Sequence, residues 1–124
     1  MDIMSSVLIV ESDLKVMEML SSLLSLQHMK VLKSYSIREA LVKSDRQKFS
    51  LILLSTQFIG EHYEDLLLAT DVADAINNKT PIVLLPESPE VDIFQNFQNR
   101  ILSVLPKPYD PLQLLRLVTK VVHG

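Results

Sequence analysis

The strongest constraint on the fold is a regular alternation of short apolar runs with longer amphipathic stretches. Continuous apolar runs lie at 7–10, 51–54 and 81–85, and a further run at 101–105 is interrupted only by Ser103. Between them, apolar residues recur at helical spacing, as they do at Leu14, Met17, Leu20 and Leu24. Strands and helices that alternate in this way form a parallel sheet with helices on both faces. The pattern therefore predicts an α/β fold with five parallel strands, doubly wound into three α/β/α layers.

The two remaining features of the predicted sheet are its edge and its centre. The stretch 30–34 mixes lysines with Val31 and Leu32, which is typical of an edge strand protected against pairing with another chain. The stretch 51–54 is apolar throughout and is expected at the centre. Pro81 and Pro86 delimit the fourth strand, because a proline cannot donate a ladder hydrogen bond from inside a central strand.

Polar residues before the amphipathic stretches predict where helices begin. The capping candidates are Asp13, Ser36 with Glu39 in the capping-box arrangement, and Asp110 followed by Pro111. The first helix is expected to end near Gln27 and the last to continue through Val122. A further helix is expected from Tyr63 to the turn at Asn77–Asn78, and another over 89–99.

Length and composition predict one domain over residues 1–124. With 48% hydrophobic and 22% charged residues, the chain can bury a single core. The net charge of −3 argues against direct binding to nucleic acid. There is no cysteine, no apolar run approaches the length of a membrane helix, and no leader precedes Val7, so we expect a cytoplasmic protein without a membrane segment.

Ligands of open parallel sheets bind beyond the carboxyl ends of the strands, where the strand order reverses. The residues to consider are therefore those that follow each strand: Glu11, Ser12, Asp13, Ser55, Pro86 and Lys107. We expect these side chains to lie together.

The acidic stretch after the first strand, the Lys107–Pro108 pair before the last helix and the order of the elements together resemble the receiver domain of bacterial response regulators. The resemblance covers essentially the whole chain and implies a flavodoxin-like fold. In that family, two acids and an acceptor aspartate hold Mg²⁺ for phosphoryl transfer. A hydroxyl on the fourth strand and an aromatic residue on the fifth then respond to the phosphoryl group.

This chain departs from the family pattern at most of those positions. Ser55 stands at the acceptor position and Ser12 at the second acid, while Pro86 and Val104 replace the switch hydroxyl and the aromatic residue. Glu11 is the one retained acid and so a weak candidate for Mg²⁺, whose binding we expect to be weak or absent. We expect no cofactor and no enzymatic activity.

Lys107 is the switch-site residue that the chain retains. In the family this lysine precedes a cis proline and pairs with the acceptor site, which suggests phosphate recognition. With the acceptor aspartate gone, we favour an ion pair with Glu11 or Asp13 instead. Ser55 could itself accept a phosphoryl group, but a serine nucleophile needs a base and a metal, and Glu11 is the acid expected near it.

Two other groups of charged residues suggest a possible metal site and a possible dimer face. Glu61, His62, Glu64 and Asp65 could suggest a metal site, although exposed acids favoured by the dipole of the helix that follows are the simpler interpretation. Receivers commonly dimerise through their fourth helix, fifth strand and fifth helix. Opposite charges on the matching elements here would suit such a homodimer, although an ordinary solvated helix face is the simpler interpretation. The charged residues are Glu87, Glu90 and Asp92 on one side and Arg116 and Lys120 on the other.

The sequence thus predicts a degenerate receiver, or pseudo-receiver, that acts in two-component-type signal transduction through protein–protein contacts without phosphorylation. Its partners are expected to be signalling proteins, either a kinase or a downstream target. Two alternatives stay open: a residual phosphoryl-accepting domain that uses Ser55 or another residue, and a pseudo-receiver that senses a small molecule in the vacated pocket.

Overall fold

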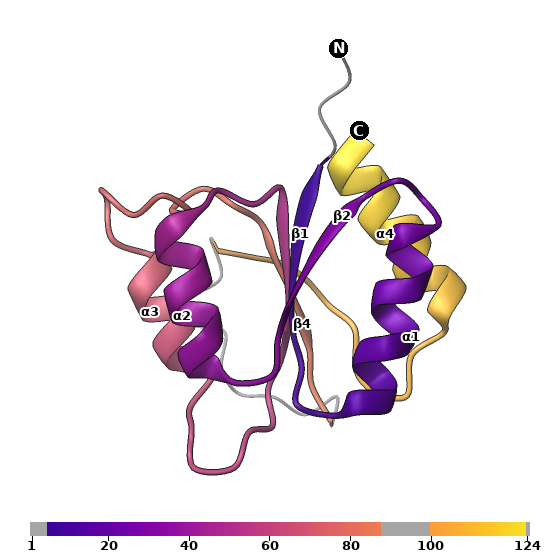
Figure 1. Cartoon of the computed structure of the whole chain (residues 1–124), viewed down its shortest axis with the longest axis horizontal. Coiled ribbons are helices and arrows are strands. Elements are labelled where there is room, and N and C mark those ends of the chain that lie inside the picture. The colour runs from indigo at the N-terminus through magenta and orange to yellow at the C-terminus, as the bar shows by residue number, and fades with distance from the viewer. Residues whose placement is uncertain (1–4, 88–99, 124) are drawn as a thin grey trace.

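One parallel sheet runs through the centre of the molecule (Figure 1). The computed structural model describes residues 5–87 and 100–123, and the structural statements below concern these residues. Within them the sheet has the order β2-β1-β3-β4-β5. Its strands are β1 (Ser6–Val10), β2 (Lys30–Ser34), β3 (Leu51–Ser55), β4 (Ile82–Leu85) and β5 (Ile101–Val104). The predicted five-stranded α/β fold is confirmed.

The order of the strands follows from their burial. All five residues of β3 are buried, and β3 pairs with β1 on one side and β4 on the other. This confirms the predicted centre of the sheet. At one edge, β2 pairs only with β1 and leaves Lys30 exposed, as expected for a protected edge strand.

Helices cover both faces of the sheet (Figure 1). They are α1 (Leu14–Ser25), α2 (Ile37–Arg46), α3 (Glu64–Thr70) and α4 (Pro111–His123). Alternate residues of each strand point to opposite faces, so Val7 and Ile9 pack with α1 and α4, whereas Leu8 and Val10 pack with α2 and α3. The sheet therefore separates two apolar cores.

The predicted helix starts at Asp13, Ser36 and Asp110 are confirmed. The Asp13 carboxylate accepts hydrogen bonds from the backbone of Lys15 and Val16, and the Ser36 hydroxyl accepts one from Glu39 N. Asp110 Oδ1 accepts one from Leu112 N at 2.9 Å. These bonds satisfy backbone donors that a helix leaves free at its start.

The predicted helix from Tyr63 to Asn77–Asn78 is wrong in its length. It begins at Glu64 and already ends at Thr70, and turns follow. Side chains from elsewhere explain the early end: Arg100 donates to Thr70 Oγ1 and to the Asn78 carbonyl. The amide of the fully buried Asn77 donates to the carbonyls of Ser44 and Gln47. These bonds stabilise a turn conformation that a continued helix could not adopt.

Smaller boundary differences concern α1, β4 and β5. Helix α1 ends at Ser25, two residues before the predicted end near Gln27, because Gln27 N and His28 N donate to the carbonyls three residues back, as in turns, and His28 then adopts a φ of 60°. Strand β4 begins at Ile82, and β5 ends at Val104. The predicted 89–99 helix lies outside the described residues. None of the helices described is long and apolar enough to cross a bilayer.

Candidate functional site

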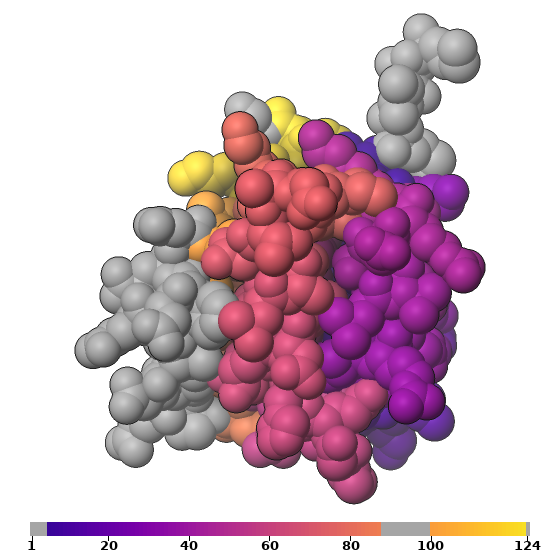
Figure 2. All heavy atoms as spheres, turned by 90° about the vertical axis from the view of Figure 1, so that its left-hand side faces the viewer, coloured from indigo at the N-terminus to yellow at the C-terminus, as the bar shows by residue number. Residues whose placement is uncertain are grey.

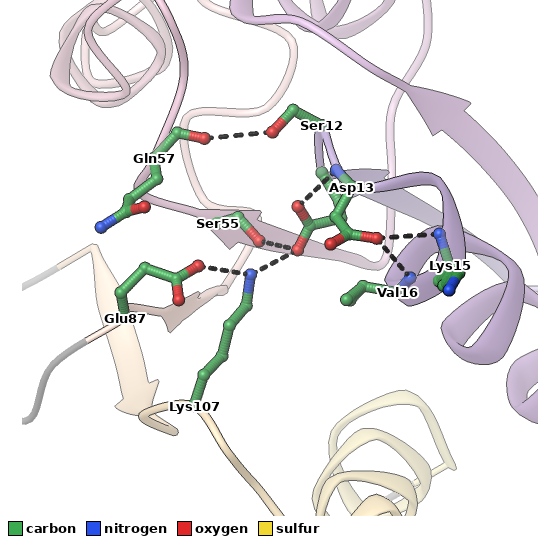
Figure 3. A network of polar contacts seen from close by, with 9 residues as sticks. Ser12, Asp13, Lys15, Val16, Ser55, Gln57, Glu87 and Lys107 are labelled. Atoms are coloured by element: carbon green, nitrogen blue, oxygen red, sulfur yellow. Dashed lines mark hydrogen bonds and ion pairs between the residues drawn. The ribbon is translucent and has the colours of Figure 1, made fainter.

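Four strand ends converge at one edge of the sheet, as the sequence predicts. Glu11 follows β1, Ser55 ends β3, Glu87 lies two residues beyond β4, and Lys107 follows β5. Figure 3 shows the side chains of Ser55, Glu87 and Lys107 pointing toward one another. Because the four segments are adjacent in a parallel sheet, residues up to 96 positions apart in sequence come into contact.

The Glu11 carboxylate is the centre of this cluster. Its Oε1 accepts a hydrogen bond from Ser55 Oγ at 2.6 Å and another from Lys107 Nζ at 2.6 Å. Its Oε2 accepts one from Asp13 N at 2.9 Å. Glu11 is 2% exposed and Ser55 is 1% exposed. A buried carboxylate is stable only when donors surround it, and these three donors meet that need.

Lys107 provides the positive charge of the cluster. Besides Glu11, its ammonium contacts Glu87 Oε1 at 3.0 Å, and the Lys107–Pro108 peptide bond is cis. Burial lowers the pKa of Lys107, but hydrogen bonds and charges from Glu11 and Glu87 outweigh burial and leave that pKa above its usual value. Lys107 is therefore a firmly protonated ammonium held between two carboxylates.

The predicted ion pair of Lys107 is present with Glu11, whereas Asp13 instead caps α1. The sequence does not predict the contact with Glu87, which it places only on the possible dimer face. One sequence signal was available, because Glu87 directly follows the proline that ends the β4 segment.

The remaining predicted site positions have structural contacts. Ser12 is exposed, and its hydroxyl donates to the Gln57 carbonyl at 3.2 Å, away from the Glu11 carboxylate (Figure 3). Pro86 is buried and accepts a backbone hydrogen bond from Lys107 N at 2.7 Å. Val104 packs, partly buried, against the apolar core under α2 and α3.

Tyr109 is a site residue that the sequence did not single out. Its hydroxyl is buried and has no hydrogen-bond partner among the described residues. Burial raises the pKa of Tyr109, and the negative charges of Glu11 and Glu87 raise it further. The phenol is therefore neutral and adjoins the acidic cluster.

A cavity of about 530 Å³ lies over the strand ends. Glu11, Ser12, Asp13 and Glu87 line it together with the loop residues 56–59. The cavity is thus largely acidic at the strand ends, and its opposite wall is the β3–α3 loop. It occupies the place where the sequence predicts the ligand site of a parallel sheet.

The donor set does not suit Mg²⁺. A magnesium ion needs several hard oxygen ligands in octahedral geometry, and both oxygens of Glu11 already accept hydrogen bonds from Ser55, Lys107 and Asp13 N. The Lys107 ammonium lies 2.6 Å from the oxygen that a cation would need. Among the described residues, no three His, Asp or Glu side chains form a group that could hold a metal.

Glu61 has a different role from the one that its sequence position suggested. It does not act as an exposed acid at the start of α3. Its carboxylate accepts hydrogen bonds from Ile37 N at 2.8 Å and Arg38 N at 3.0 Å, and so caps α2 from a distant loop. This contact ties the cavity-lining loop after β3 to the start of α2.

The charges of the predicted dimer face are only partly described. Arg116 and Lys120 are exposed on α4, as expected. Glu87 contacts Lys107, and the other two acids of that face, Glu90 and Asp92, lie outside the described residues.

Comparison of the whole fold with solved structures finds receiver domains. The chemotaxis response regulator CheY4 of Vibrio cholerae is 23% identical, with a TM-score of 0.81 over 96% of this chain and 99% of that one. The receiver domain of a putative Luxo repressor protein from Vibrio parahaemolyticus is 20% identical, with a TM-score of 0.85 over 98% and 92%. The receiver domain of the sensor histidine kinase PA1611 from Pseudomonas aeruginosa, which has magnesium in its active-site cleft, is 15% identical, with a TM-score of 0.82 over 98% and 100%.

No protein-family model and no curated protein matches the sequence significantly. At these low identities, the structural likeness establishes the fold: this chain has the flavodoxin-like fold of response-regulator receiver domains. Function must be argued from the site itself.

Proposed function

We propose that residues 1–124 form one receiver-like, non-enzymatic signalling domain that works in the cytoplasm through protein–protein contacts without being phosphorylated. The observation that carries this proposal is the closed cluster at the acceptor position. There the Ser55 hydroxyl and the Lys107 ammonium both donate to the same oxygen of Glu11. The fold supplies the two-component context by analogy with the receivers it resembles.

The chemistry of phosphoryl transfer supports the proposal. That reaction requires a reachable nucleophile and a cation that neutralises charge as it develops. Ser55 is 1% exposed, and Lys107 already neutralises Glu11. Pro86 has no hydroxyl or N–H with which to follow a new phosphoryl group. Each requirement is therefore unmet at the position where the family fulfils it.

Two observations favour the alternatives that the sequence left open. The short contact between Ser55 Oγ and Glu11 provides a base next to a hydroxyl, as residual serine phosphorylation would need. The cavity of about 530 Å³ over the strand ends offers room for a small polar ligand instead. Ser55 is too buried for the first alternative, and no described feature identifies a ligand for the second.

The deciding experiment is incubation of the purified protein with acetyl phosphate and Mg²⁺, followed by intact-mass measurement. We expect no stoichiometric phosphoryl adduct. A matched Ser55→Ala variant identifies the residue if an adduct forms. A mass increase of one phosphoryl group in the wild type that Ser55→Ala abolishes would replace the pseudo-receiver proposal with the serine-acceptor alternative.

A further inference from the structure

Helix α2 and the edge strand β2 carry an excess of positive charge that the strand-end site does not use. Residues 30–48 contain six of the chain's 12 Lys and Arg residues and only two acids, although the whole chain has a net charge of −3. Four of the six basic residues are exposed: Lys30, Arg38, Arg46 and Lys48. This side of the molecule is therefore basic, although the protein as a whole is acidic.

The basic residues surround a groove with an aliphatic floor. The groove lies between α2 and β2, has a volume of about 480 Å³, and is lined by Leu32 and Val42 with Arg38, Lys43 and Arg46 around them. Glu39 also lines it but is neutralised by Lys43 at 3.7 Å. Val42 is 45% exposed, which is a large exposure for an aliphatic residue on a packed helix.

Three groove residues form a regular stripe along α2. Arg38, Val42 and Arg46 follow one another at intervals of four, so they lie on one side of the helix. At 1.5 Å per residue, the two arginines are about 12 Å apart along the helix axis. Within the described residues neither arginine forms an ion pair. Each guanidinium can therefore bind a carboxylate in the bidentate geometry that arginine favours.

Neighbouring features favour a helix over an extended strand as the occupant. The Lys43 ammonium donates to the Lys33 carbonyl, so an added strand could not use that edge acceptor of β2. A second hollow of about 360 Å³ borders α2 on the side of α3, and Val42 and Arg46 line it too. Figure 2 shows α2 in purple beside α3, with this furrow between them.

We propose that this groove binds an acidic amphipathic helix of a partner protein. An apolar side chain of that helix packs on Leu32 and Val42, and carboxylates four residues before and after it reach Arg38 and Arg46. The groove is hollow, which suits a projecting side chain better than a flat membrane surface. Its lining has no aromatic residue on which a nucleic-acid base could stack.

The test uses isotope-labelled full-length protein and a synthetic helical peptide in which Leu is flanked by Glu at spacings of four. Amide resonances should shift mainly at Leu32 and over 38–47. The same peptide with Lys in place of Glu serves as the charge control and should not bind. Poly-glutamate, anionic lipid vesicles and duplex DNA test whether charge alone, a membrane or a nucleic acid is the better ligand.

Matched protein variants separate this groove from general charge effects. Arg38→Glu with Arg46→Glu should weaken peptide binding about tenfold, because two attractive contacts become repulsive. Lys15→Glu with Lys79→Glu makes the same change in net charge at exposed positions outside the groove and should leave binding within about twofold. Val42→Ser should weaken binding without any change in charge.

Several outcomes overturn the proposal. It is wrong if the peptide causes no shifts, if its lysine version binds equally well, or if both double variants lose affinity to the same extent. Vesicles or DNA that outcompete the peptide through the same arginines reassign the groove to those ligands. None of these outcomes depends on Ser55, so they leave the phosphorylation experiment unaffected.

Discussion

Lys107 is the single residue on which the strand-end cluster most depends, because its ammonium contacts Glu11 and Glu87 together. The Lys107 ammonium gives the cluster a covalently attached positive charge. Removal of Lys107 would leave the nearly buried Glu11 carboxylate with only the Ser55 hydroxyl and one backbone donor. The cluster is therefore expected to stabilise the fold as a structural element.

Lys107→Met should lower the free energy of unfolding by about 3 kcal/mol at neutral pH, because it leaves a buried charge without its partner. Ser55→Ala removes one hydrogen bond to a charged group and should cost about 2 kcal/mol. Urea denaturation measures both. Lys15→Met, at an exposed position, is the control and should have little effect. Equal, small losses in all three variants would mean that the cluster does not stabilise the fold.

The raised pKa of Lys107 gives that stabilisation a defined pH dependence. Since the folded protein holds this proton more tightly than the unfolded chain, the contribution is complete below the usual pKa of 10.5. It is lost as the pH rises through the higher folded pKa. The stability difference between wild type and Lys107→Met can be measured in urea from about pH 8 to about pH 12. It should stay constant up to about pH 10.5 and shrink above that pH.

Burial raises the pKa values of Tyr63 and Tyr109 as well, so both tyrosines also destabilise the fold in alkali. They are present in both proteins, and the comparison with Lys107→Met therefore isolates the lysine. A difference that stays constant across the range would contradict the assigned ion pairs.

At the scale of elements, the loop between β3 and α3 is fixed by contacts to other parts of the fold. Glu61 caps α2, and the Ser12 hydroxyl donates to the Gln57 carbonyl. The loop thus holds one wall of the strand-end cavity in place without any ligand. The Glu61 carboxylate therefore links the start of α2 to the loop that lines the cavity.

Glu61→Ala should destabilise the protein by about 1 kcal/mol, the usual cost of losing a helix cap. Amide hydrogen exchange should also become faster at Ile37 and Arg38, whose N–H groups lose their acceptor. Asp65→Ala removes the same charge from an exposed position in the first turn of α3 and is the control. Unchanged exchange at those two amides in Glu61→Ala would show that the cap is not formed in solution.

The elements differ in how well the sequence predicts them. Helix α1 and strand β3 were predicted because periodicity and a local cap determine them. Helix α3 was predicted too long because Arg100 and Asn77, whose partners are distant in sequence, stabilise the turns after Thr70. No local pattern reveals such contacts. The same reason explains why the cap of Glu61 on α2 was missed.

For the molecule as a whole, the predicted topology shows where the site lies but does not identify every residue that contributes to it. Glu11, Ser55 and Lys107 were expected together because parallel strands end at one edge. The rule gives no side-chain directions, so it could not show that Glu87 completes the ion pairs of Lys107. The direction of a side chain depends on packing that only the folded structure supplies.

Assembly is the second property of the whole molecule that can be tested. If the face formed by residues 89–99, β5 and α4 mediates a homodimer, Arg116→Glu with Lys120→Glu should weaken it, since both cations are exposed. Sedimentation velocity measures dimer formation, and added salt should weaken the wild-type dimer because it screens these charges. Wild-type protein that remains monomeric at high concentration removes the homodimer from consideration.

We propose that Ser12 and Ser55 stand where a receiver would place metal-binding acids, and that Lys107 neutralises Glu11, the acid that this chain retains. The most direct test compares melting temperatures with and without Mg²⁺ for wild type and for Ser12→Asp with Ser55→Asp. In chelator, repulsion among three carboxylates should lower the stability of the double variant.

Mg²⁺ at about a hundred times its dissociation constant should restore about 2.7 kcal/mol to the double variant, or about 10 °C for a domain of this size. The wild type should show no comparable shift, because it offers Mg²⁺ the Glu11 carboxylate alone, whereas the double variant offers three carboxylates. A double variant as indifferent to Mg²⁺ as wild type would contradict the convergence of these strand ends. A wild type that Mg²⁺ stabilises would contradict the closed cluster itself.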